Sequence, residues 1–88
     1  MNKLFIEFIG TLFLVYIILT TGNYLAIGSS LAIIILLGNK ISGAHFNPAV
    51  TLALASMGKF KKNDVIPYIL SQLAGGLTAV KLYTLTKN

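Results

Sequence analysis

The stretch that decides the fold is SGAHFNPAVT, residues 42–51, which places a His, an Asn and a Pro inside an otherwise apolar chain. Asn is a favoured residue at the cap position of a helix. Pro is favoured at the first helical position, because its missing N–H is not needed there and its fixed φ already suits the helix. The pair Asn47-Pro48 therefore predicts a helix that begins at Pro48 and a non-helical segment before it.

The composition around this stretch is that of a membrane protein. Of the 88 residues, 56% are hydrophobic and 10% are charged, and the mean hydropathy is +0.83. A soluble domain usually carries about 25% charged residues. Lipid solvates such an apolar surface, so we predict an integral membrane protein that is embedded in the bilayer. The length allows one domain, and the absence of Cys excludes a disulfide framework and a thiolate metal site.

The charge pattern argues against a nucleic-acid partner. The net charge is +5, but all seven cations are Lys and they lie at the ends of apolar runs. A nucleic-acid-binding surface would gather them on one face, whereas cations at the ends of apolar runs are typical of membrane boundaries.

Three apolar runs are long enough to cross a bilayer, which takes about 20 residues. They are residues 4–21, 24–41 and 65–85. We reject a cleavable signal peptide over the first run, because Glu7 interrupts its start and TTGNYLA is a poor cleavage site. The prediction is an all-α, multi-pass membrane protein with a single domain over residues 1–88.

The segment after Pro48 is too short to be a further span, because residues 48–57 reach only about half of the bilayer at roughly 1.5 Å per residue. We predict a re-entrant loop over residues 42–47 followed by a half-helix over 48–57. Non-helical backbone at that depth is tolerated where it is buried in protein or lines a water-filled cavity. The loop carbonyls and the Asn47 amide are therefore expected to meet a polar permeant, while the positive helix end disfavours cations.

The lysines predict the orientation of the chain. With a re-entrant segment in the middle, five lysines fall on one side of the membrane and two on the other. By the positive-inside rule the N-terminus is expected in the cytoplasm. The first group is Lys3, Lys40, Lys59, Lys61 and Lys62, the last three within a predicted surface loop over residues 59–64, and the second group is Lys81 and Lys87.

Over its ten positions, SGAHFNPAVT resembles the first Asn-Pro-Ala loop of the aquaporin and glycerol-facilitator (major intrinsic protein) family. EFIGT, residues 7–11, resembles the start of that family's first helix, and SQLAGG, residues 71–76, resembles part of its third. The resemblance implies three transmembrane helices plus one re-entrant half-helix, which is half of the aquaporin-like inverted-repeat fold. It further implies a passive channel for water or small neutral solutes such as glycerol, with no catalysis and no cofactor.

The resemblance also implies roles for individual residues. Asn47, Pro48 and Ala49 would form the signature loop, with Asn47 facing the permeant, and Gly43, Ala44 and His45 would lie along the cytoplasmic half of the pore. Ile27 matches the outer constriction, where the family commonly has an aromatic residue. The constriction's Arg follows a second loop in the family, and this sequence has no Arg. A wider constriction is favoured.

The remaining polar residues have structural interpretations. Glu7 is either a solvated helix end or, by the resemblance, a buried carboxylate that accepts backbone N–H groups of the loop. Gln72, Gly75 and Gly76 are expected to serve helix packing, since small residues let backbones approach and Gln can bond across helices. His45, taken alone, is more typical of a hydrogen-bonded structural histidine, and a metal site is not expected.

A single half cannot enclose a pore, because lipid would then face the polar loop. We therefore expect an antiparallel homodimer, a higher oligomer or a separate complementary half-channel chain, and the lysine bias favours the separate chain over dual insertion. The alternatives are a non-conducting membrane interaction protein, a lesion-forming protein or a channel remnant. A membrane hydrolase using Ser42 and His45 is less favoured, because no acid lies near them in sequence.

Overall fold

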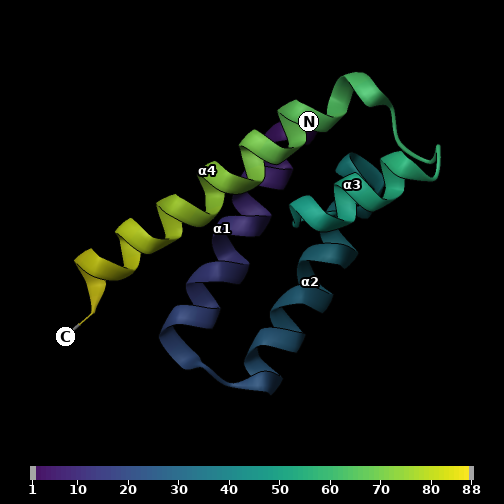
Figure 1. Cartoon of the computed structure of the whole chain (residues 1–88). Helices are drawn as coiled ribbons and strands as arrows, with labels where there is room; N and C mark the ends of the chain where they lie inside the picture. The colour runs from purple at the N-terminus through teal and green to yellow at the C-terminus, as the bar shows by residue number, and fades with distance from the viewer. Residues whose placement is uncertain (1, 88) are drawn as a thin grey trace.

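The computed structural model describes residues 2–87, and these residues form four α-helices and no strand (Figure 1). The first, second and fourth helices are long and apolar enough to cross a membrane, and the third is a short helix of nine residues. The predicted fold class, an all-α membrane protein with a half-helix, is confirmed. The helices are α1 (Lys3–Thr21), α2 (Tyr24–Ser42), α3 (Pro48–Ser56) and α4 (Lys62–Thr86).

Asparagine caps begin the first three helices. The side-chain oxygens of Asn2, Asn23 and Asn47 accept hydrogen bonds from backbone N–H groups in the first turns of α1, α2 and α3. Glycines in the left-handed conformation end the first two helices, with φ of 55° at Gly22 and 87° at Gly43. Because Gly22 and Asn23 are adjacent, α1 turns directly into α2 without a longer loop.

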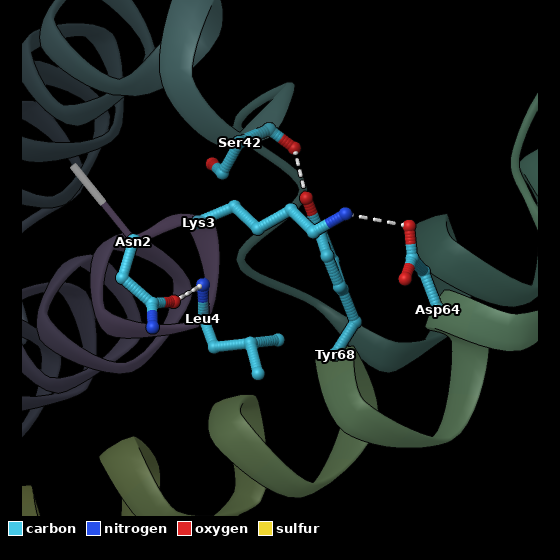
Figure 2. A network of polar contacts seen from close by, with 6 residues as sticks. All are labelled: Asn2, Lys3, Leu4, Ser42, Asp64 and Tyr68. Atoms are coloured by element: carbon cyan, nitrogen blue, oxygen red, sulfur yellow. Dashed lines mark hydrogen bonds and ion pairs between the residues drawn. The ribbon is translucent and has the colours of Figure 1, made fainter.

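The helix α1 lies between α2 and α4 and packs on both. One end of α1 is tied to α4 by an ion pair between Lys3 Nζ and Asp64 Oδ2 at 2.8 Å (Figure 2). Near the other end, the hydroxyls of Tyr16 and Thr86 are 2.7 Å apart. The helices α1 and α4 are therefore parallel and begin on the same side of the molecule. This arrangement is expected when α2 returns across the membrane and α3 dips in without crossing.

The helix boundaries differ from the sequence-based limits at a few positions. The helix α4 begins at Lys62 rather than at Val65. Asp64 explains the earlier start, because an acidic residue in the first turn is stabilised by the positive end of the helix and this one also pairs with Lys3. The helix α2 continues through Ser42, so the non-helical loop covers residues 43–47.

Candidate pore loop

The loop of residues 43–47 has an unusual backbone. Gly43, Ala44 and Phe46 all have positive φ, at 87°, 55° and 55°. Residues other than Gly adopt this conformation at a cost of about 1–3 kcal/mol each, so the surroundings must hold it in place. The contacts that hold the loop come from α1, α2, α3 and α4.

Glu7 of α1 is the central contact of the loop. Its side chain is fully buried, and its two oxygens accept four hydrogen bonds. One oxygen, Oε2, accepts from the backbone N–H of His45 at 3.1 Å and from Ser42 Oγ at 2.7 Å. The other, Oε1, accepts from the backbone N–H of Phe46 and from Gln72 Nε2, both at 2.8 Å. Four donors around one carboxyl group fit the ionised form.

Two further bonds connect this carboxylate to the half-helix. Gln72 Nε2 also donates to Thr51 Oγ1 at 2.9 Å, and the same Thr51 oxygen lies 2.8 Å from His45 Nδ1. Both Gln72 and Thr51 are buried. In addition, the Tyr68 hydroxyl donates to the carbonyl oxygen of Ser42 at 2.7 Å (Figure 2). The loop is thus hydrogen-bonded directly to α1, to α3 and to the end of α2. Helix α4 supports it indirectly, through the bonds of Tyr68 and Gln72 to Ser42, Glu7 and Thr51.

Aromatic packing supports the same loop. The Phe46 ring fills a slot between α1 and α2, where Gly10 and Gly38 leave room for it. A Cβ atom at Gly10 would overlap the ring, and one at Gly38 would lie 3.1 Å from it. The His45 ring packs edge-on against Phe60, and the centroids of these two rings are 4.7 Å apart. The side chains of His45 and Phe46, whose backbone N–H groups donate to Glu7, are therefore both held in place by packing.

The outer side of the loop carries Asn47. This residue is exposed, and its Oδ1 accepts the backbone N–H of Ala49 at 2.8 Å. Within residues 2–87 its Nδ2 has no hydrogen-bond partner, so this donor is free at the N-terminal end of α3. A groove of about 350 Å³ opens beside it, between apolar walls and the loop. The walls are Leu14, Leu31, Ile35 and Val50, and the loop side is Ala44, His45, Phe46 and Asn47.

The structure separates Ile27 from the other predicted residues. Ile27 lies on α2, one turn before Leu31, on the face that borders the groove. It is about 12 Å along the helix from Ile35 at roughly 1.5 Å per residue. Ile27 does not line the groove itself. Pro48 and Ala49, by contrast, form the first turn of α3 directly beside Asn47.

The predicted packing residues lie where α1 meets α4. Gly75 is buried, and a Cβ atom there would overlap the carbonyl oxygen of Phe8 on α1. At Gly76 an added Cβ atom would lie 3.8 Å from the Val15 side chain, which is an ordinary contact distance. For the hydrolase alternative, Ser42 Oγ donates to Glu7 and His45 Nδ1 faces Thr51, so the structure does not join Ser42 to His45.

Sequence reasoning did not single out Thr51, Tyr68 or Phe46. Thr51 is a polar residue within the SGAHFNPAVT stretch, which could have drawn attention to it, although its side chain is buried whereas that of Asn47 is exposed. Tyr68 and Phe46 carry no such signal, because their roles depend on how α4 and α1 approach the loop. Within residues 2–87 no cluster of three or more His, Cys, Asp or Glu side chains is placed to hold a metal ion.

Comparison with known proteins identifies the family of the chain. The sequence model of the major intrinsic protein family matches residues 20–88. The chain is 48% identical to Aquaporin Z of Photorhabdus laumondii over 65 residues, which are 73% of this chain and 28% of that protein. It is 42% identical to a probable glycerol uptake facilitator protein of Thermotoga maritima over 71 residues, 81% of this chain and 29% of that protein.

A third relative is the glycerol uptake facilitator protein of Streptococcus pneumoniae. The two are 35% identical over an alignment of 98 positions, gaps included, which covers 88% of this chain and 40% of the relative. The chain belongs to the major intrinsic protein family, and together with its three apolar helices this makes it an integral membrane protein. It spans less than half the length of the curated relatives named here.

Proposed function

We propose that this chain forms one half of a passive transmembrane channel for water or small neutral solutes such as glycerol. The observation that carries the proposal is that the two sides of the loop of residues 43–47 have different contacts. Its inner side is bonded to Glu7, while its outer side presents the free Asn47 Nδ2 to a groove. Family membership supports a channel role for a loop of this kind.

In this proposal Asn47 is the central hydrogen-bond donor of the pore. A permeant oxygen accepts from Asn47 Nδ2, and permeant hydrogens donate to the carbonyls of Gly43, Ala44 and His45. The N-terminal end of α3 adds a positive field at the same place, which disfavours cations. The apolar walls opposite offer the permeant no hydrogen bond, so its polar contacts lie along the loop.

The proposed constriction contains Ile27, one turn beyond the groove on α2. The aliphatic side chain of Ile27 offers the permeant no hydrogen bond. On the side that this half supplies, the constriction therefore selects by width rather than by polar recognition. We therefore propose that small polyols are admitted along with water.

The proposed pore requires a second half to cover the exposed loop face. Asn47 and Val50 are exposed beside the groove, and a polar loop facing lipid would be costly. A second copy in the opposite orientation or a complementary chain would supply such a half. With the N-terminus in the cytoplasm, as the five-to-two lysine bias favours, the complementary chain is the better fit.

Asn47→Ala is expected to lower the channel-dependent permeability of the assembled protein by roughly tenfold, the equivalent of one hydrogen bond of about 1–1.5 kcal/mol in the transport barrier. The measurement is stopped-flow light scattering of proteoliposomes after an osmotic step, first with this chain alone and beside empty vesicles. Protein insertion is verified in each sample. A rate with the wild-type chain no faster than in empty vesicles would contradict self-assembly into a pore.

Two control variants separate the donor role of Asn47 from its role as a helix cap. Asn47→Asp keeps a good cap but has only acceptor oxygens when it is ionised, so it should lose permeability as Asn47→Ala does. Asn63→Ala changes an exposed Asn in the first turn of α4 and should behave as wild type. Full permeability in Asn47→Asp would show that Asn47 acts only as a cap and would refute the donor role.

A further inference from the structure

We infer that Glu7 fixes the tautomer of His45 through Gln72 and Thr51, so that His45 is neutral and carries its hydrogen on Nε2. The tautomer follows from the hydrogen bonds around the four side chains. Its consequence for permeation, a second donor beside Asn47, rests on the proposed channel function.

The first step sets the orientation of the Gln72 amide. The atom of Gln72 that lies 2.8 Å from Glu7 Oε1 must be the nitrogen, because an amide oxygen there would face a carboxylate oxygen with no hydrogen between them. Gln72 Nε2 has two hydrogens. One is donated to Glu7 and the other to Thr51 Oγ1, at 2.9 Å.

The second step sets the direction of the Thr51 hydroxyl. Thr51 is fully buried, so its hydrogen needs an acceptor within the protein. Elsewhere in the chain such hydrogens return to a carbonyl four residues earlier, as from Thr78 to Ala74. Among the described residues Thr51 makes no bond of that kind, and Gln72 Nε2 is only a donor. The remaining neighbour is His45 Nδ1, at 2.8 Å, so Thr51 donates to it.

The third step follows for the imidazole ring. A ring nitrogen that accepts a hydrogen bond carries no hydrogen, so His45 is neutral and its hydrogen is on Nε2. This nitrogen is near Gly43, where a Cβ atom would lie 3.4 Å from it. It has no partner within residues 2–87, and His45 lines the groove that holds Asn47. Nε2–H is therefore free to donate to an oxygen at the loop.

Asn47 and His45 both line the groove, and no charged side chain is among its lining residues. The inference places His45 Nε2–H there as a second side-chain donor beside Asn47 Nδ2. A solute that accepts two hydrogen bonds through neutral oxygens matches this arrangement. Water and polyols have such oxygens. Thr51 and Gln72 act as positioning residues, because they set where the His45 hydrogen lies without reaching the groove themselves.

The test uses the fact that the chain has a single His. Protein labelled with ¹⁵N only in histidine gives one pair of ring nitrogen signals, which NMR in lipid bilayers at neutral pH assigns to the two positions. We expect Nδ1 to show the shift of an unprotonated nitrogen and Nε2 to show a directly bonded hydrogen. An Nδ1 that carries a hydrogen in the wild-type protein, as the other tautomer or as imidazolium, would overturn the inference.

Variants of Thr51 test the cause of the tautomer. Thr51→Val removes the hydroxyl donor, so the single Nε2–H form should give way to a mixture, and Thr51→Ser should restore it. Thr78→Val removes a hydroxyl that bonds within its own helix and should leave both signals unchanged. Unchanged signals in Thr51→Val would refute the role of Thr51. If Thr51→Val does not fold, the wild-type spectrum and Thr51→Ser still decide.

The spectra and the permeability measurement can fail independently. A chain that conducts nothing can still show the Nε2–H tautomer, and this result would refute the channel but not the inference. A chain that conducts but carries a hydrogen on His45 Nδ1 would refute the inference and leave the channel function standing. The tautomer is therefore tested apart from the proposed function.

Discussion

Glu7→Gln is expected to lower the free energy of unfolding by roughly 3–5 kcal/mol. The amide keeps one acceptor oxygen and replaces the other by a donor. If the nitrogen takes the Oε2 position, Ser42 can turn its hydroxyl and accept, but the backbone N–H of His45 then faces another N–H. A buried donor without an acceptor costs about 1–3 kcal/mol, and each remaining bond loses roughly 1 kcal/mol when its acceptor is no longer charged.

The measurement is the thermal unfolding of the detergent-solubilised protein, together with amide hydrogen exchange at His45 and Phe46. Exchange should increase first at these two amides, because they lose the acceptor that holds the strained loop. The matched control is Asp64→Asn. It also replaces a carboxylate by an amide, but in a partly exposed ion pair with Lys3, whose side chain is 44% exposed, so about 0–1 kcal/mol is expected. Equal stability of the two variants would contradict the prediction.

The secondary structure was predictable from the sequence because it follows local rules. Asn47-Pro48 marks the start of α3, and the length of each apolar run is enough to indicate a span. The limits of α4 were less predictable. The KFKKND segment, residues 59–64, has loop composition, yet Asp64 stabilises a helix start at Lys62 by its charge and by its contact with Lys3.

The hydrogen-bond network of the loop was only partly predictable. A buried acid near the start of a span is expected to have partners, and the family resemblance implied that these are loop N–H groups. The link from Gln72 through Thr51 to His45 was not predicted, because it joins side chains from α4, α3 and the loop. Such a link depends on the distance between α4 and α1 in the folded protein. The spacing of residues along the sequence does not give that distance.

Gly75→Ala tests that approach. A Cβ atom at Gly75 would overlap the carbonyl oxygen of Phe8 and lie 3.1 Å from the backbone nitrogen of Leu12. Backbone atoms of a packed helix cannot move aside as a flexible side chain can, so α4 must shift away from α1. Overpacking of this kind typically costs about 1–3 kcal/mol. We expect a loss at or above the upper end of that range, measured by thermal unfolding in detergent.

The neighbouring glycine provides the matched control. At Gly76 the same added atom would meet only Val15, at 3.8 Å, which is ordinary contact. Ala also favours a helix by about 0.8–1 kcal/mol over Gly, so Gly76→Ala should leave stability unchanged or raise it slightly. If the two variants have the same stability, α1 and α4 do not make the close contact seen in the structure.

The same pair of variants also shows whether helix packing holds the loop in place. Gln72 precedes Gly75 by one turn on the face of α4 that meets α1, and it bonds to Glu7 at 2.8 Å. A shift of α4 away from α1 should weaken that bond and those that depend on it. Amide exchange at His45 and Phe46 should therefore increase in Gly75→Ala and stay at the wild-type rate in Gly76→Ala. Unchanged exchange in a destabilised Gly75→Ala protein would mean that Glu7 holds the loop without help from α4.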